Sequence, residues 1–379
     1  MKTVARGAPG ERATSHANYG DGAMKKTLIV IAIAAVAVTL AYSQRATIAG
    51  RILERGMETR MGADIVDTME DGLHLGLCGA GGPMPAPTAS GPCIVIVAGE
   101  KLFMVDAGTD GIRNMARMGY QTGTLQGVFL THFHSDHIDG LGEAGTIRWA
   151  GGDNTQPLPV FGPEGVTEVT KGFNRAYAQD FIYRHKHHGD TVAPLSGAGL
   201  EPRPFPVPDR GQLVVVYQDG DLTVEALAVD HAPAEPSVGY KFTYKDRSLL
   251  ISGDSSKSAN ILKFAQGVDL LAHDALAANI VQMMKESSLS RGNIIMATIT
   301  HDIPDYHATP VEAAETARDA GVGHLLYYHI VPPMIVPGQH ALFLNGAEDI
   351  FPNYTIGQDG VAFSLPAGST DIIQTSRGL

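Results

Sequence analysis

Four side chains that can bind a metal ion are crowded into six positions at the end of an apolar run. His132, His134, Asp136 and His137 lie in Thr-His-Phe-His-Ser-Asp-His, directly after Val-Phe-Leu at 128–130. Imidazole and carboxylate groups are the ligands that hold zinc and similar ions. Burying several such groups without partners is costly. The motif therefore predicts one half of a metal site, and the other half must lie further along the chain.

Further residues of the same kind follow later apolar runs. His231 comes after Leu-Ala-Val-Asp, Asp254 after Leu-Leu-Ile-Ser-Gly, and His329 after Leu-Leu-Tyr-Tyr. His307 opens His-Ala-Thr-Pro, directly before a predicted helix. Because sites are usually built on loops held by rigid strands, these residues are candidates for the missing half.

Together these motifs resemble the metallo-β-lactamase superfamily, whose signature is HxHxDH. Within it, the chain resembles the branch of ribonuclease Z and the type III arylsulfatases. The resemblance covers nearly everything after residue 73, and it implies an α/β fold, a four-layer αβ/βα sandwich. The segments that carry it are 130–137, 229–231 with 239–242, 251–255, 273–274, 307–309 and 328–329.

The resemblance also implies two divalent metal ions, which would be zinc, with manganese or iron as alternatives. It assigns the first metal to His132, His134 and His231. It assigns the second metal to Asp136, His137 and His329, with Asp254 bridging both. A hydroxide held between the two metals would then be the nucleophile.

Catalytic roles beyond metal binding follow from the same resemblance. Asp136 would steer a proton as well as bind metal, and His307 would donate a proton to the leaving group, supported by Asp274 and His273. A helix cap or surface residue is the alternative for His307, and a hydrogen-bonded strand-end residue is the alternative for His273. Asp106 matches an early strand-end aspartate that holds backbone or a ligand histidine, and an ordinary turn aspartate is its alternative.

The composition and one spacing between motifs limit the class of substrate. The chain has 379 residues, of which 44% are hydrophobic and 18% charged, and its net charge is −12. That charge disfavours a broad basic surface for nucleic acid. Ribonuclease Z enzymes commonly carry a long basic arm between the motifs at His231 and Asp254, and the short stretch between them leaves no room for one. We therefore expect a small-molecule ester as substrate.

The N-terminal segment has the pattern of an export signal. Lys25 and Lys26 precede an apolar run at 28–42 that is interrupted only by Thr39. The length suits a signal-peptide core, and an uncleaved membrane anchor is the alternative. Both place the catalytic part outside the cytoplasm, in the periplasm or secreted, or anchored to the inner membrane.

The expected organisation has five parts. Residues 1–23 are a disordered segment or an extension upstream of a start at Met24, 24–43 a signal peptide or anchor, and 44–72 a lead-in helix and linker. Residues 73–368 form the catalytic domain, and 369–379 form a C-terminal tail. Short apolar runs between glycine-rich turns predict strands, and helices are predicted at 111–118, 166–178, 258–266, 275–286 and 310–319.

Two smaller features remain. Cys78 and Cys93 flank a segment rich in glycine and proline, and they form either a disulfide or two separate buried thiols. The histidines at 185–188 are predicted to lie in a solvated loop or lid rather than in a metal-binding tract.

The sequence thus predicts an exported, dinuclear metal-dependent hydrolase of small anionic esters, either arylsulfatase-like or a phosphodiesterase. The alternatives are a ribonuclease Z-like nuclease and a hydrolase of lactone or β-lactam type.

Overall fold

The computed structural model describes residues 21–378, so the extension expected at the start of the chain lies almost wholly outside the described residues. The chain divides into two units, Met1–Gly62 and Ala63–Leu379. The first contains helices α1 (Asp21–Ser43) and α2 (Arg45–Arg60). Within α1, Met24–Ser43 is long and apolar enough to cross a membrane, and none of it is buried. A signal sequence near the N-terminus satisfies the same criterion.

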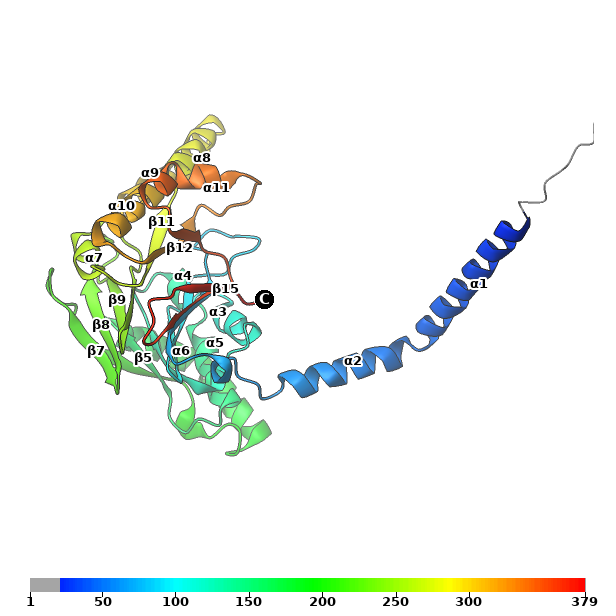
Figure 1. Ribbon diagram of the computed structural model, residues 1–379. Coiled ribbons are helices and arrows are strands. Elements are labelled where there is room, and N and C mark those ends of the chain that lie inside the picture. Colours follow the sequence, from blue (N-terminus) through cyan, green and yellow to red (C-terminus); the bar gives the residue numbers. More distant parts are fainter. Residues whose placement is uncertain (1–20, 379) are drawn as a thin grey trace, which may run out of the picture. The chain divides into compact units, whose positions relative to one another are not determined.

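The second unit is built on two β-sheets (Figure 1). Within the described residues, the first sheet has eight strands in the order β15-β14-β1-β2-β3-β4-β5-β6, and the second has seven in the order β13-β12-β11-β10-β9-β8-β7. The strands of the first sheet are β1 (Gly72–Gly79), β2 (Cys93–Ala98), β3 (Lys101–Val105), β4 (Leu125–Phe129), β5 (Leu158–Gly162), β6 (Leu200–Pro204), β14 (Val361–Pro366) and β15 (Ile373–Ser376). Those of the second are β7 (Val214–Asp219), β8 (Leu222–Ala228), β9 (Val238–Tyr244), β10 (Arg247–Ile251), β11 (Leu270–Leu276), β12 (His324–Val331) and β13 (Tyr354–Ile356).

Alternating side chains explain why both faces of each sheet are covered. In β2, Ile94 and Ile96 belong to the core between the two sheets, whereas Val95 and Val97 belong to a second core on the outer face. Successive side chains of a strand point to opposite faces, so a strand that is apolar at every position needs a layer on each side. The outer layers are helices, and the fold is the α/β sandwich that the sequence predicted.

The helices of this unit cover the outer faces of the sheets. Side chains of α3, α5 and α6 join the outer core of the first sheet, and side chains of α7, α10, α11 and α12 join that of the second. Their bounds are α3 (Gly111–Arg117), α4 (Ser135–Ile138), α5 (Leu141–Gly151), α6 (Val166–His188), α7 (Ala259–Phe264), α8 (Ala278–Ser290), α9 (Ile294–Asp302), α10 (Pro310–Ala320), α11 (Gln339–Leu344) and α12 (Ala347–Ile350). Figure 1 shows α8, α9 and α11 gathered at one end of the unit.

Three segments differ from the sequence-based expectation. The predicted tail contains β15, which pairs with β14, and the buried Arg247 donates hydrogen bonds to the carbonyls of Ser369 and Asp371 in front of it. The histidines at 185–188 form the last turn of α6 rather than a loop, because the helix predicted at 166–178 continues to His188. Helix α9 was not predicted. Its many β-branched residues show no clear helical period.

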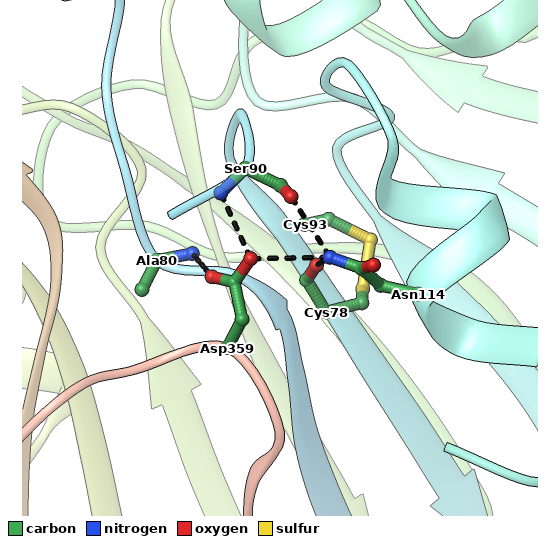
Figure 2. The surroundings of a disulfide bond; sticks show 6 residues. All are labelled: Cys78, Ala80, Ser90, Cys93, Asn114 and Asp359. Carbon is green, nitrogen blue, oxygen red and sulfur yellow. Dashed lines mark hydrogen bonds between the residues drawn. A yellow bond between two sulfur atoms is a disulfide. The ribbon is translucent and has the colours of Figure 1, made fainter. Parts of the chain in front are cut away.

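Cys78 and Cys93 form a disulfide, which decides between the two alternatives that the sequence left open. Beside this bond, the Asp359 carboxylate accepts hydrogen bonds from the backbone N–H groups of Ala80 and Ser90, each at 2.8 Å (Figure 2). Asn114 donates to the same carboxylate at 3.1 Å and to the carbonyl of Cys78 at 2.9 Å. Both ends of the loop at 80–92 are therefore held in place.

We expect the disulfide to contribute measurably to the free energy of unfolding. Replacing both cysteines, as Cys78→Ser with Cys93→Ser, should lower the free energy of unfolding by about 3 kcal/mol, because the unfolded chain regains the freedom of a 15-residue loop. Urea unfolding of the full-length chain measures this difference. A reducing agent should bring the wild type down to the variant and leave the variant unchanged. Equal midpoints in oxidising buffer would contradict the prediction.

Candidate metal centre

The ends of strands from both sheets meet at one edge of the sandwich and carry the candidate ligands. In the second sheet, β8, β10, β11 and β12 all run in the same direction, so their carboxyl ends lie at the same edge. His231 follows β8, Asp254 follows β10, and His329 lies near the end of β12. From the first sheet, the segment after β4 supplies His132 and leads into α4.

Four of the predicted ligands form the first group. Ligand atoms of His132, His134, His231 and Asp254 all lie within 4.8 Å of one another. His134 Nδ1 lies 2.8 Å from His132 Nε2 and 3.4 Å from His231 Nε2. His134 is the exposed member, and the other three are buried. Three imidazoles whose nitrogens converge in this way have the arrangement of a metal-binding face.

The second group contains Asp136, His137 and His329, whose ligand atoms also lie within 4.8 Å of one another. The Asp136 carboxylate is 3.3 Å from His329 Nε2 and 3.6 Å from His137 Nε2. The structure therefore places the predicted second set of ligands together, on elements from both sheets.

Asp254 links the two groups through one oxygen. Its Oδ2 lies 3.4 Å from His137 Nε2 and 3.3 Å from His329 Nε2. The same atom lies 3.9 Å from the Nε2 atoms of His132 and His231. A carboxylate in this position could be shared by cations held in the two groups.

The donor set fits divalent cations. His137 Nε2 and Asp254 Oδ1 are buried and have no hydrogen-bond partner among the described residues. Such atoms are rare in folded proteins and require an explanation, which a bound ion would provide. Five imidazoles and two carboxylates supply nitrogen and oxygen ligands of the kind that zinc, manganese or iron accepts.

The protonation of the imidazoles also fits metal binding. Burial holds the pKa of His132 well below its ordinary value, which keeps the imidazole neutral and a good ligand. Burial would lower the pKa of His137 too, but Asp254 and Asp106 outweigh it and raise that pKa well above its ordinary value. A cation bound beside His137 must therefore displace a proton.

Hydrogen bonds behind the ligands determine which nitrogen each imidazole presents. His137 Nδ1 lies 2.8 Å from Asp106 Oδ2, and His231 Nδ1 lies 2.9 Å from the carbonyl oxygen of Tyr306. Both oxygens are acceptors, so each Nδ1 donates a proton to its partner and each Nε2 is the nitrogen presented to a cation. Asp106 also accepts from the backbone N–H of Thr131 at 2.8 Å and from its hydroxyl at 2.9 Å. Asp106 is thus a buried organiser of this segment rather than an ordinary turn residue.

His307 is positioned beside the two groups by the start of α10. Thr309 and Glu312 form a capping box there, and Pro310 occupies the first turn. His307 Nδ1 lies 2.9 Å from Asp274 Oδ2, and its ring is nearly parallel to that of His329 at 5.5 Å. Its ligand atoms also come within 4.8 Å of those of Asp254 and His329, so the arrangement would permit it to bind metal.

Asp274 and His273 lie behind His307, fully buried at β11. His273 Nδ1 lies 3.0 Å from Asp274 Oδ1. Burial would raise the pKa of Asp274, but the neighbouring imidazoles of His273 and His307 outweigh it and hold that pKa below its ordinary value. A carboxylate at this position can accept the Nδ1 proton of His307 and so orient its ring.

Other histidines lie outside this arrangement. His301 is exposed and contacts Lys285 at 3.2 Å, and His185 bonds to the carbonyl of Ala193 at 3.0 Å. Tyr306 was not predicted as a site residue, although its carbonyl orients His231 and its side chain borders the cavity beside the ligands. Its position directly before His307 was the only available signal in the sequence.

A cavity of about 460 Å³ opens onto the ligands. Its walls come from the loop at 83–85, helix α9, the segment at 303–307 and the end of β12. His134, Asp136, Asp254, His307 and His329 lie along it. The cavity is large enough to bring a small substrate against the candidate metal ligands.

Comparisons with known proteins agree with this geometry. The family profile described as "Beta-lactamase superfamily domain" matches residues 102–330. Ribonuclease Z of Mycobacterium sp. (strain KMS) is 33% identical over 281 residues, which is 74% of this chain and 91% of that protein. Ribonuclease Z of Mycobacterium bovis (strain BCG / Pasteur 1173P2) is 34% identical over 269 residues, 70% of this chain and 89% of that protein.

Solved structures show the same fold. The metallo-beta-lactamase fold protein YhfI from Bacillus subtilis aligns with a TM-score of 0.54 and 20% identity, over 77% of this chain and 99% of that chain. The short form of human tRNase Z aligns with a TM-score of 0.52 and 19% identity, over 77% of this chain and 99% of that chain. At these identities the likeness concerns the fold alone.

The hydrogen bond behind His137 predicts a change in metal affinity. Asp106→Asn removes the charged acceptor that orients His137 and should weaken zinc binding by about 10- to 100-fold. Competition between the full-length chain and a zinc-binding dye measures the change. Asp110→Asn, an exposed aspartate of the same turn, is the matched control and should bind zinc as the wild type does. Equal affinities for the two variants would contradict the role given to Asp106.

Proposed function

We propose a metal-dependent phosphodiesterase activity for this chain, which belongs to the beta-lactamase superfamily and has relatives named ribonuclease Z. The observation that carries the proposal is the position of Asp254, whose single oxygen lies within 3.9 Å of imidazoles from both ligand groups. That arrangement supports two adjacent divalent ions, most simply zinc. The first would be held by His132, His134 and His231, the second by Asp136, His137 and His329, with Asp254 shared.

Two adjacent ions supply, when bound, Lewis acidity toward the nonbridging oxygens of the ester and a water nucleophile at neutral pH. The protein contributes the remaining functions. Asp106 and Tyr306 orient two of the ligands, as their hydrogen bonds indicate. Asp136, at the cavity wall, is in a position to steer a proton of the attacking water.

His307 is proposed as the general acid. Its Nδ1 proton is committed to Asp274, so Nε2 is the atom that can transfer a proton to the leaving oxygen. The ring lies on the cavity wall and is 8% exposed, which lets a bound substrate reach it while bulk water is largely excluded. Asp274 acts through His307, as a positioning residue that holds the ring and its tautomer.

A small phosphodiester is favoured over structured RNA. The segment between His231 and Asp254 consists of a turn followed by β9 and β10, and it forms no projecting arm. Among the described residues, none of those that line the cavity is a lysine or an arginine. A polyanion needs such charges to neutralise its phosphates. A sulfate monoester is the second candidate substrate, because it presents the same single negative charge on nonbridging oxygens.

Two features support a location of the catalytic unit outside the cytoplasm. The first is α1, which has the length and composition of a membrane span or signal sequence. The second is the disulfide between Cys78 and Cys93, since such bonds persist mainly in oxidising compartments. We infer export, with or without an N-terminal anchor, and a small-molecule ester rather than nucleic acid as the substrate.

The activity is tested with bis(nitrophenyl) phosphate and the full-length chain loaded with zinc or manganese. Turnover should stop on removal of the metal by a chelator and return when the metal is restored. His132→Ala and Asp254→Ala should each lower kcat/KM by more than about 100-fold, because a ligand is lost outright. His301→Ala, an exposed histidine outside the site, is the control and should retain activity. Turnover of nitrophenyl sulfate without turnover of the phosphodiester would replace the proposal by its sulfatase alternative.

The role of His307 predicts a dependence on the leaving group. His307→Ala should lower kcat by about 10²- to 10⁴-fold for a phenyl or alkyl ester, whose leaving oxygen needs a proton. The loss should be much smaller for a nitrophenyl ester, whose leaving group departs without one. Asp274→Asn should show the same trend more weakly. Metal content, measured by elemental analysis, should equal that of the wild type. A loss of metal with uniform loss of activity would identify His307 as a ligand instead.

A further inference from the structure

The cavity beside the candidate metal ligands has an apolar wall. Six residues of this wall carry the argument: Met84, Met296, Ile299, Ile303, Tyr306 and Val331. The charged residues along the cavity are Asp136 and Asp254, both candidate ligands, and no lysine or arginine lines it in the described part of the chain. A substrate bound here therefore finds its electrostatic partners on one side, at the metals, and apolar surface on the others.

Part of this wall belongs to a packed cluster. Val331 is buried against Leu276 and Val281, and Met84 and Ile303 pack on the same cluster. Met84 lies in the loop whose ends are held by the disulfide and by Asp359. A wall supported in this way keeps its shape when a ligand enters, so burial of apolar ligand surface is not offset by reordering of the protein.

Helix α9 supplies Met296 and Ile299 to the wall and continues it outward. Met296 and Ile299 border the cavity, and Ile299 is 46% exposed. Ile295, on the same helix, is 77% exposed and does not line the cavity. An apolar group that fills the cavity can therefore extend along Ile299 toward the surface.

We propose that this cavity binds the apolar substituent of the phosphodiester, an aryl group or a short alkyl chain, and that the wall formed by Met84, Met296, Ile299 and Val331 sets the specificity. The inference rests on the proposed function and adds the chemical class of the substrate to it. A cavity of about 150 Å³ suffices for a benzene ring. The cavity of about 460 Å³ therefore accommodates an aryl or butyl group together with the phosphoryl group.

The preference for an apolar substituent follows from the free energy of removing it from water. Each methylene that leaves water for an apolar wall contributes to binding, and the contribution appears in kcat/KM when the contact persists in the transition state. A nucleotide substituent brings further phosphates and polar base edges, which this wall cannot pair and which lose their hydration on entry. The wall thus favours an apolar substituent over a nucleotide.

The test is a series of nitrophenyl alkyl phosphates with methyl, ethyl, propyl and butyl groups, assayed with the metal-loaded full-length chain. We expect kcat/KM to rise about threefold to fourfold with each methylene that the cavity buries. Ile299→Ser should lower kcat/KM for the butyl ester by about tenfold more than for the methyl ester, so that the alkyl series becomes flatter. Ile295→Ser is the matched control on the same helix and should leave the whole series unchanged.

A binding measurement separates this inference from the proposed activity. Methyl(phenyl)phosphinate and butyl(phenyl)phosphinate have the charge of a phosphodiester but no ester bond, and calorimetry should show tighter binding of the butyl compound with a more negative heat-capacity change. A flat alkyl series, with phosphodiesterase activity present, would overturn the inference and leave the proposed function standing. A dinucleotide cleaved with higher kcat/KM than the butyl ester would do the same. Preference for the butyl phosphinate without any turnover of phosphodiesters would refute the proposed function and support the assignment of the cavity.

Discussion

The buried carboxylate of Asp254 is the constraint on which the site depends. It lies among four imidazoles that are contributed by both sheets, and it is 2% exposed. A buried charge is tolerated only where opposite charge and hydrogen bonds surround it. The ends of β4, β8, β10 and β12 must therefore meet at one edge of the sandwich, and the apolar core between the sheets is what holds them there. The geometry of the site therefore depends on the fold, because the packing of the core sets the distance between the candidate ligands.

Because the strand ends meet at one edge, several residues there adopt unusual backbone conformations. Asp106 has φ 55° and His329 has φ 46°, and Gly253, directly before Asp254, has φ 64°. A left-handed conformation is unfavourable for residues with a side chain, least so for Asp and Asn. Strain of this kind persists where the surroundings impose it, and it concentrates at functional sites. At Asp106 the three hydrogen bonds of the carboxylate provide that support. At Gly253 a side chain would meet the carbonyl of Val238 at 2.7 Å, so glycine is required there.

The sequence identified the candidate ligands more readily than the cavity, for a physical reason. Each ligand is a polar residue directly after an apolar run, a contrast that can be seen in one dimension, and the family resemblance supplied their grouping. The walls of the cavity have no such contrast. Ile299 lies in a run of apolar and β-branched residues that fits a helix or a strand, and Met84 lies in a proline-rich loop without any period. The pairing of β15 was equally hidden, because it depends on a partner strand and on Arg247, which is distant in the sequence.

The two walls of the cavity differ in how they are supported, and this difference bears on how substrate choice can change. The loop that carries Met84 is closed by a disulfide and held by Asp359, so its position is coupled to the core of the first sheet. Helix α9 packs on α8 and exposes Ile294, Ile295 and Ile299, so few buried contacts constrain its side chains. Substitutions in α9 can therefore alter the apolar wall with little effect on stability and none on the ligands. Under the proposed function, chemistry and selectivity would reside on separate elements, so a chain of this fold could keep the seven candidate ligands and act on a different ester.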